Sequence, residues 1–183
     1  MTEKHGASAR LDLKQFIRNV KDFPKPGIVF RDITTLIVQP KAMTYAVDRL
    51  AEEAGRRGAE AILGAEARGY IFASAVAYKL KLPMMIVRKP GNLPFKTISH
   101  TYQLEYGTDT LQIHEDAVKS GQKVFLIDDL LATGGTIAAC AELVGKLGGQ
   151  VVGAAFVIEL SFLKGRQKLG SIPVFSIVDY ESE

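Results

Sequence analysis

Residues 123–136 read KVFLIDDLLATGGT, and this stretch decides the fold. The apolar run Val124–Ile127 is typical of a buried parallel strand, and Asp128 and Asp129 follow where that strand is expected to end. A loop of small residues, Ala132–Thr136, then leads into apolar residues at helical spacing: Ile137, Cys140, Ala141 and Val144. Strand, acidic pair, glycine loop and helix together predict an anion site at a helix N-terminus.

The two parts of this stretch suit different ligand groups. Gly134 and Gly135 let the backbone approach a phosphate closely, and the first N–H groups of the following helix have no partner inside the helix. Thr133 and Thr136 add hydroxyl donors. The two carboxylates repel a phosphate and suit ribose hydroxyls or a hydrated cation. The alternative is a structural strand-to-helix turn with both aspartates solvated at its mouth.

Length and composition favour one domain spanning residues 1–183. The chain is 47% hydrophobic, which is enough for a substantial core, and its formal net charge is only +3. The sequence contains no block of Lys and Arg that would predict nucleic-acid binding, so we assign the small positive charge to local phosphate sites. Cys140 is the only cysteine and is expected in the core. We expect no membrane partner and a cytoplasmic setting, because no membrane-length apolar stretch or signal-peptide pattern is present.

The remaining sequence alternates strand patterns with helix patterns. Residues 1–10 are polar and expected to be flexible, and the spacing of apolar residues from Leu13 to Val20 predicts a short helix. Longer helices are expected from Pro40 to Gly58 and from Gly69 to about Lys79, with further strands at Ala61–Leu63, Met84–Val87, Val151–Ile158 and Val174–Val178. This order predicts an α/β fold, a mostly parallel twisted sheet with helices on both faces.

An N-terminal flap and a mobile β-hairpin lid are expected beside the sheet. The flap contains Ile28–Asp32, either an edge strand or the lining of a pocket. The lid follows an irregular stretch from Pro90 to His100, and its strands are expected at Tyr102–Tyr106 and Leu111–His114.

A second glycine loop, Gly64–Gly69, has the glycine spacing of a P-loop. Tyr70 stands where a P-loop needs lysine, so ATP hydrolysis of that type is not expected, and no strand is followed by a dinucleotide-binding glycine motif. Such a loop is often only a tight turn, but Arg68 favours an anion site. Both glycine loops are expected at the carboxyl ends of strands, where α/β proteins collect their ligands.

Two more candidates lie around the predicted lid. Arg88 and Lys89 open a long loop whose alternative interpretation is a solvated, charged connection; a long loop in a compact domain is often a lid, and these cations suit pyrophosphate. Glu105 lies in an aromatic, alternating strand, where a solvent-facing glutamate is the ordinary interpretation, although its place after the loop favours a role facing the ligand. The three histidines have no metal-ligand spacing.

From Phe23 to the C-terminus the chain resembles the adenine phosphoribosyltransferases, a family of type I phosphoribosyltransferases. The resemblance rests on six motifs in order: FPKPGIVFRD (23–32), EARG (66–69), VRK (87–89), LEYG (104–107), DDLLATGGT (128–136) and ELSFLKG (159–165). It implies the type I phosphoribosyltransferase fold, with a base-binding flap at 23–35 and a lid loop at 88–105. The implied reaction, in purine salvage, is Mg²⁺-dependent transfer of 5-phosphoribosyl from phosphoribosyl pyrophosphate (PRPP) to adenine, giving AMP and pyrophosphate.

The resemblance also implies residue roles. Adenine would be held by Val29, Phe30, Arg31 and Leu163, with Glu105 as the catalytic carboxylate beside the purine N7. The ribose and 5′-phosphate would be held by Asp128, Asp129, Ala132, Thr133, Gly134, Gly135 and Thr136. Pyrophosphate would be held by Arg68 and, from the neighbouring subunit of a homodimer, by Arg88 and Lys89. Mg²⁺ would be held by PRPP and water, without a direct protein ligand.

One departure and two alternatives remain. Asn92 stands where family members commonly carry lysine, which removes one pyrophosphate contact unless Lys96 substitutes. A phosphoribosyltransferase for xanthine, hypoxanthine or orotate is the nearest alternative, and Phe30, Arg31 and Glu105 argue against it. A regulator that binds PRPP without catalysis is the second. Such proteins usually carry a DNA-binding module, for which we expect no room before Leu11, and the intact acidic pair, Arg68 and Glu105 favour turnover.

Overall fold

The computed structural model describes residues 11–103 and 107–183. The predicted flexibility of residues 1–10 and the predicted catalytic role of Glu105 therefore lie outside the described residues. Contacts within the chain divide it into two compact units, Met1–Tyr45 and Ala46–Glu183, and each is described by itself. The prediction of one domain over the whole chain stays a prediction.

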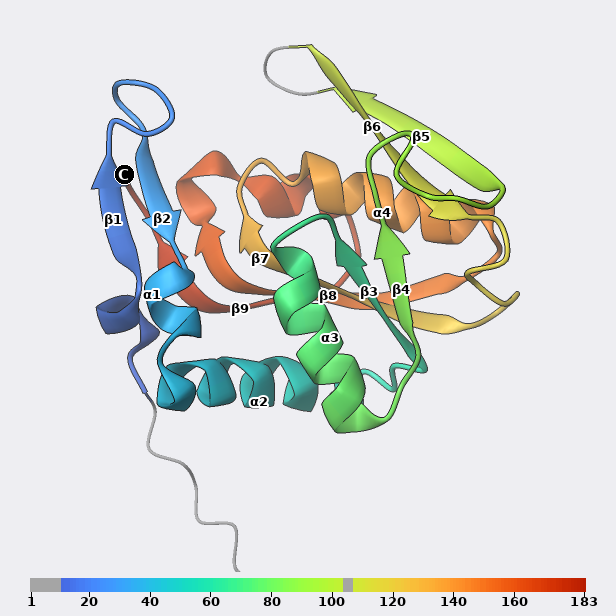
Figure 1. Cartoon of the computed structure of the whole chain (residues 1–183), viewed down its shortest axis with the longest axis horizontal. Coiled ribbons are helices and arrows are strands. Elements are labelled where there is room, and N and C mark those ends of the chain that lie inside the picture. Colours follow the sequence, from blue (N-terminus) through green and yellow to red (C-terminus); the bar gives the residue numbers. More distant parts are fainter. Residues whose placement is uncertain (1–10, 104–106) are drawn as a thin grey trace, which may run out of the picture. The chain divides into compact units, whose positions relative to one another are not determined.

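The first unit is built on a β-hairpin (Figure 1). Strand β1, Arg18–Lys21, pairs antiparallel with strand β2, Val29–Asp32, so that Val20 lies opposite Phe30. The predicted helix through Val20 was wrong beyond its first turn. Only a 3₁₀ turn, η1 (Leu13–Phe16), forms, because the following residues gain a cross-strand partner that a helix would deny them. The short helix α1, Thr34–Ile37, was not predicted.

The second unit contains a five-stranded sheet in which all strands are parallel (Figure 1). The strand order is β4-β3-β7-β8-β9. The strands are β3 (Ala61–Ala65), β4 (Met84–Val87), β7 (Lys123–Leu131), β8 (Gln150–Leu160) and β9 (Val174–Tyr180). All five residues of β3 are buried, as expected of a strand covered on both faces. The predicted α/β fold is confirmed.

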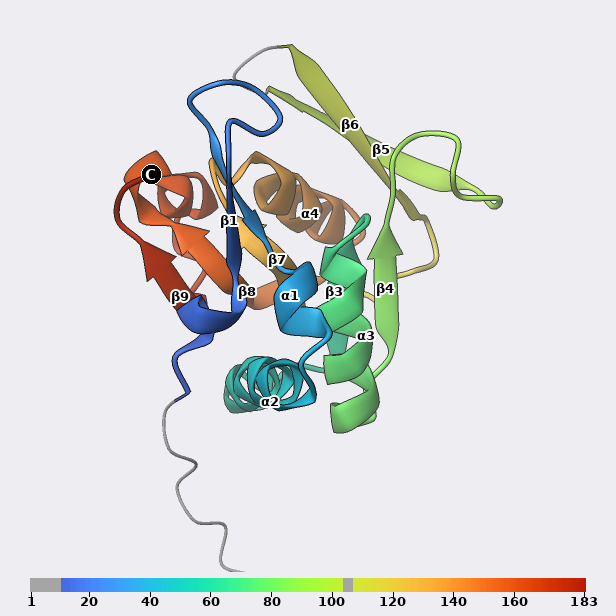
Figure 2. The same cartoon turned by 60° about the vertical axis from the view of Figure 1, so that its left-hand side comes forward.

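Helices α3 (Gly69–Leu80) and α4 (Gly135–Lys146) follow β3 and β7 and pack against these strands. On α3 the buried residues include Phe72, Ala73 and Val76, which recur at helical spacing. The helix approaches the sheet closely because Gly64 has no side chain: a Cβ there would lie 2.7 Å from the Cβ of Ala73. Figure 2 shows α4 on the face of the sheet opposite α3, between the sheet and the β5–β6 hairpin.

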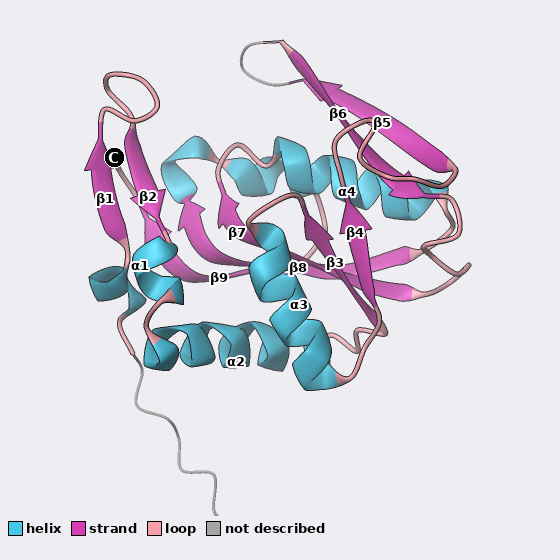
Figure 3. Ribbon diagram, in the orientation of Figure 1, coloured by secondary structure: helices cyan, strands magenta, loops and turns pink. Residues whose placement is uncertain are grey.

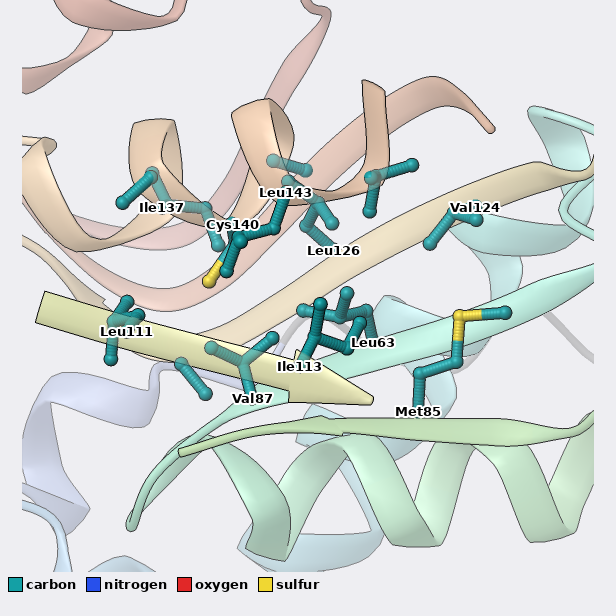
Figure 4. Packing of buried hydrophobic residues seen from close by; sticks show 14 of the residues in the cluster. Leu63, Met85, Val87, Leu111, Ile113, Val124, Leu126, Ile137, Cys140 and Leu143 are labelled. Atoms are coloured by element: carbon teal, nitrogen blue, oxygen red, sulfur yellow. The ribbon is translucent and has the colours of Figure 1, made fainter. Parts of the chain in front are cut away.

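The main hydrophobic cluster lies beneath α4 (Figure 4). Leu63 and Leu126 come from the sheet, Cys140 from the helix and Ile113 from the hairpin, and each is fully buried. Side chains from three separate elements therefore close one core, and the predicted core position of Cys140 is confirmed. Burial raises the pKa of its thiol, which keeps it protonated and unreactive.

Helix α2, Pro40–Arg56, contains the boundary between the two units. It begins at Pro40 as predicted, because proline is well suited to the first turn of a helix. Short 3₁₀ segments, η2 (Ser161–Leu163) and η3 (Gly165–Leu169), connect β8 to β9. Within the described residues, no helix has the length and apolar character needed to cross a membrane.

The predicted hairpin exists, but its boundaries differ from the expected ones (Figure 3). Strand β5 spans Thr97–Gln103 and pairs antiparallel with β6, Thr108–His114. We expected an irregular chain as far as His100, and the difference has a tertiary cause. Ile98 lies opposite Ile113 and packs against the main cluster, which stabilises strand geometry in a segment whose own pattern is weak.

Candidate active site

A cavity of about 470 Å³ opens at the carboxyl ends of β3 and β7. It is lined by two connections that lie far apart in sequence, residues 66–68 and residues 128–137. Strands β3 and β7 are parallel neighbours, with Gly64 opposite Ile127, so both strands deliver their following loops to the same edge of the sheet. The structure thus brings together the two glycine loops. Arg68 and all seven residues predicted for the ribose and 5′-phosphate line this cavity.

The acidic pair lies within a strand, which corrects the prediction that the strand ends at Ile127. Strand β7 continues to Leu131 because β8 still pairs with it there, with Leu131 opposite Glu159. Asp129 is buried and forms an ion pair with Arg68, whose Nε lies 2.7 Å from its Oδ2. The guanidinium predicted for pyrophosphate is therefore held directly beside the acidic pair.

Asp128 is the most electrostatically perturbed group in the cavity. Burial, and then the negative charge of Asp129, raise its pKa well above the usual value. Its Oδ1 accepts the backbone N–H of Asp129 at 2.9 Å. Gly69, the first residue of α3, lies close to this carboxylate: a Cβ at that position would lie 2.6 Å from the same oxygen, which would have to shift. The first turn of α3 and the end of β7 consequently share one crowded contact.

The loop of residues 132–136, predicted to bind phosphate and called the phosphate loop below for that prediction, leads into α4 as the sequence predicted. Gly134 has φ +79° and precedes the first helical residue, Gly135. A residue with a side chain adopts this left-handed conformation only at a cost, so glycine suits the position. The N-cap residue Gly134 makes no side-chain cap hydrogen bond, and the first residues of α4 line the cavity, where unpaired helix N–H groups suit an anion.

The hairpin reaches the phosphate loop through Tyr102, a contact that the sequence did not predict. The Tyr102 hydroxyl lies 3.2 Å from the Thr136 Oγ1 and 3.4 Å from an oxygen of Asp109. Lys89 in turn donates to the same Asp109 oxygen at 2.6 Å, which raises the pKa of the lysine. The alternation of β5 was the available signal, but it does not show which partner a tyrosine meets.

Arg88 and Lys89 do not line the cavity. Arg88 Nε lies 3.1 Å from Glu66 Oε2, and Asn92 donates to both oxygens of that carboxylate. The pKa of Glu66 is lowered, first by the backbone N–H of Lys89 and also by Arg88. Glu66, by contrast, does line the cavity, although we had not assigned it a role. The predicted contribution of Arg88 and Lys89 to pyrophosphate binding stays a prediction.

The predicted adenine-binding residues fall in both units. Val29, Phe30 and Arg31 lie on β2, and Leu163 lies on η2. Within the first unit, Phe30 makes an edge-to-face contact with Phe23, and Arg31 donates to Asn19 Oδ1 at 2.7 Å. Their joint role in holding a base stays a prediction.

Comparison with known proteins shows to which family the chain belongs. Residues 35–177 match the family described as phosphoribosyl transferase domain. The adenine phosphoribosyltransferase of Brachyspira hyodysenteriae is 51% identical over 93% of this chain and its own full length. The chain belongs to the adenine phosphoribosyltransferase family. Among solved adenine phosphoribosyltransferases, that of Thermoanaerobacter pseudethanolicus superposes with a TM-score of 0.89 at 48% identity, covering 92% of this chain and 98% of that one.

A third adenine phosphoribosyltransferase, from Saccharomyces cerevisiae, has 37% identity and a TM-score of 0.84, over 90% of this chain and 96% of that one. Its crystal structure is a complex with adenine and D-2,5-dideoxy-2,5-imino-altritol 1,6-bisphosphate. That family member therefore accommodates a purine base together with a bisphosphorylated sugar mimic.

Replacing Asp128 by Asn is expected to raise the free energy of unfolding of the ligand-free protein near neutral pH. The raised pKa of Asp128 makes the native state hold a proton that the unfolded chain releases. This stabilisation is complete below the unfolded value, about 3.9, and is lost as the pH rises through the native value. Asparagine avoids that loss.

Urea unfolding of both proteins across the acidic and neutral range would measure the effect. The difference should be largest near neutral pH and should vanish below the unfolded pKa of aspartate. Replacing Asp116, which is exposed, by Asn is the matched control and should leave the pH dependence unchanged. A Asp128→Asn protein that is less stable than wild type at neutral pH would contradict the burial argument.

Proposed function

We propose that this protein transfers 5-phosphoribosyl from PRPP to adenine, releasing AMP and pyrophosphate in purine salvage. The observation that carries the proposal is the single cavity formed by the Arg68 loop, the acidic pair and the phosphate loop. Membership of the adenine phosphoribosyltransferase family supports the same reaction. The ligands of the yeast relative, adenine and a sugar bisphosphate mimic, are of the chemical classes that this reaction requires.

The groups that line the cavity suit the chemical groups of PRPP. The N-terminus of α4, with Thr133 and Thr136, suits the 5′-phosphate, because its N–H groups and hydroxyls donate hydrogen bonds. The acidic pair suits the ribose hydroxyls as acceptors. Arg68 suits the pyrophosphate, because its side chain is 42% exposed and can be reached by a ligand although it pairs with the buried Asp129.

In the proposed reaction the bond between ribose C1 and the pyrophosphate oxygen breaks, and a bond from C1 to adenine N9 forms. The sugar gains positive charge while pyrophosphate leaves with negative charge. Held phosphate groups at both ends keep C1 within reach of the base, so positioning supplies much of the rate. Arg68 stabilises the leaving charge, which is electrostatic catalysis aimed at the place where charge develops.

Mg²⁺ fits beside the acidic pair, because this ion binds phosphate oxygens and usually keeps several waters, which can donate hydrogen bonds to carboxylates. In the part of the chain that the structure describes, no three His, Cys, Asp or Glu side chains are grouped to hold a metal. We therefore propose that PRPP and water hold the ion beside Asp128 and Asp129. When bound, it neutralises pyrophosphate charge. A cytoplasmic setting completes the proposal, since the highly charged PRPP does not cross an apolar bilayer.

We also propose that Val29, Phe30, Arg31 and Leu163 hold the adenine, and this assignment rests on the resemblance of their motifs. A pocket that pairs with the 6-amino group of adenine leaves buried polar groups unpaired when a 6-oxopurine enters. The protein is therefore expected to prefer adenine strongly.

AMP formation from PRPP, compared with product formation from hypoxanthine, guanine and xanthine, tests the proposed function directly. The expected kcat/KM for adenine exceeds that for each oxopurine by at least about a hundredfold, because unpaired buried polar groups carry that order of penalty. A comparable kcat/KM for hypoxanthine would overturn the adenine assignment and leave a broader phosphoribosyltransferase.

Replacing Glu105, which we propose as the catalytic carboxylate, by Gln is expected to reduce kcat at least roughly tenfold, the low end for assisted proton transfer. A carboxylate at the purine N7 favours the tautomer with a free N9 lone pair, whereas glutamine hydrogen-bonds without exchanging a proton. The affinity for PRPP should change little, because the phosphate loop is untouched. Single-turnover kinetics with adenine isolates this step, and a wild-type rate would return Glu105 to an ordinary surface role.

We further propose a homodimer in which Arg88 and Lys89 act on the partner's pyrophosphate. Neither residue lines the cavity of its own chain, which supports action from outside that cavity. Mixing an Arg88→Ala/Lys89→Ala protein with an Asp128→Ala/Asp129→Ala protein should recover about a quarter of wild-type activity. Random exchange makes half of the dimers mixed, and each then holds one intact site of two. Absence of recovery after exchange verified by mass spectrometry would contradict the shared site.

A further inference from the structure

The phosphate loop rests on the backbone of the segment that follows β8. A Cβ on Gly165, the first residue of η3, would collide with the carbonyl oxygen of Ala132, and a Cβ on Gly134 would collide with the carbonyl oxygen of Gly165. At Gly134 and Gly165, no side chain separates the two backbone segments. On this side the loop therefore packs directly against the backbone around Gly165.

The residue after Gly165 is tied to the sheet by a buried carboxylate. Arg166 donates from Nε and Nη2 to the two oxygens of Glu159, each at 2.6 Å, and Glu159 is only 3% exposed. Arg166 also donates to the carbonyl oxygen of Val174 at 3.2 Å. The Ser176 hydroxyl donates to Glu159 at 2.6 Å. This bidentate pair therefore joins η3 to both β8 and β9.

Glu159 lies on β8 directly opposite Leu131, the last residue of β7 before the phosphate loop. The Glu159 carboxylate thus lies beside the start of the phosphate loop and also holds Arg166, the residue next to Gly165. Burial tends to raise the pKa of Glu159, but the hydrogen bonds from Arg166 and Ser176 outweigh it and lower that pKa. The carboxylate is consequently charged at neutral pH and holds the guanidinium firmly.

We propose that Glu159 is a positioning residue for the 5′-phosphate: through Arg166 it presses Gly165 against the phosphate loop and so sets the spacing of the loop's N–H donors. The inference rests on the proposed function and names residues that touch no substrate in it. Losing the pair would let η3 move away from the loop. A phosphate site built from backbone N–H groups is sensitive to such a shift, since misplacement of about 1 Å can cost two orders of magnitude in rate.

The chain offers a matched control in Glu53 on α2. It is 6% exposed and accepts hydrogen bonds from Arg56 and Arg57, so it is also a buried glutamate held by arginine. Glu53 and Arg56 lie in the last turn of α2, Arg57 follows that helix directly, and none of the three lines the cavity. Replacing Glu53 by Gln therefore reproduces the loss of a buried ion pair without touching the support of the phosphate loop.

The test compares Glu159→Gln with Glu53→Gln in the full-length protein. Calorimetric dissociation constants for PRPP and AMP, the KM for PRPP, kcat and the free energy of unfolding would be measured for each. We expect Glu159→Gln to weaken PRPP and AMP binding at least about tenfold and to raise the KM for PRPP more than it lowers kcat. Glu53→Gln should lower stability while its PRPP dissociation constant stays within about twofold of wild type.

Gly165→Ala keeps the ion pair and moves the backing segment directly, so it remains informative if Glu159→Gln fails to fold. It too should weaken PRPP binding. Wild-type PRPP affinity in either Glu159→Gln or Gly165→Ala, or an equal loss in Glu53→Gln, would overturn the positioning role. If the wild-type protein itself neither binds PRPP nor forms AMP, the proposed function fails instead, so the two failures are distinct.

Discussion

Strands β3 and β7 run parallel and side by side, and the candidate site depends on this pairing. Parallel neighbours end at the same edge of a sheet, so the loops that follow them meet although about sixty residues separate them in the chain. Each loop then opens a helix, α3 on one side and α4 on the other. The cavity is the space that the two helix starts leave between them. The side chains that line the cavity are therefore those that the two loops carry.

The two aspartates of that cavity are held in different ways before any ligand arrives. Asp129 is neutralised by Arg68, while Asp128 relieves repulsion and burial through its raised pKa. The proposed site for ribose hydroxyls and pyrophosphate would benefit from this arrangement. The ion pair of Arg68 and Asp129 contains both a cation and a hydrogen-bond acceptor. A ligand with anionic oxygens for Arg68 and hydroxyls for Asp129 can replace this pair without leaving a buried charge unpaired.

Behind the loop, glycines replace side chains wherever two backbone segments touch. Gly165 clears the carbonyl oxygen of Ala132, and Gly134 clears the carbonyl oxygen of Gly165. Such contacts transmit small displacements directly, since no flexible side chain absorbs them. The pair Glu159–Arg166 is the nearest charged anchor of this packing. The conformation of the phosphate loop therefore depends on the sheet, because Glu159 of β8 holds the segment that contacts the loop.

The sequence by itself determined the parallel α/β fold, the two glycine loops and the core position of Cys140. These features rest on local patterns, namely apolar runs, glycines where backbone must turn, and helical spacing. The prediction was wrong where a distant segment decided the outcome. Val20 joined a hairpin because Phe30 lies opposite it, and β7 passed through the acidic pair because β8 continues beside it.

Tertiary structure alone decided the partners of the charged groups, Arg68 with Asp129, Arg88 with Glu66, and Arg166 with Glu159. Residue types at those positions indicate chemistry, but an ion pair needs two side chains within a few ångströms. For side chains on different elements, that proximity is set by strand order and register, which no local pattern contains.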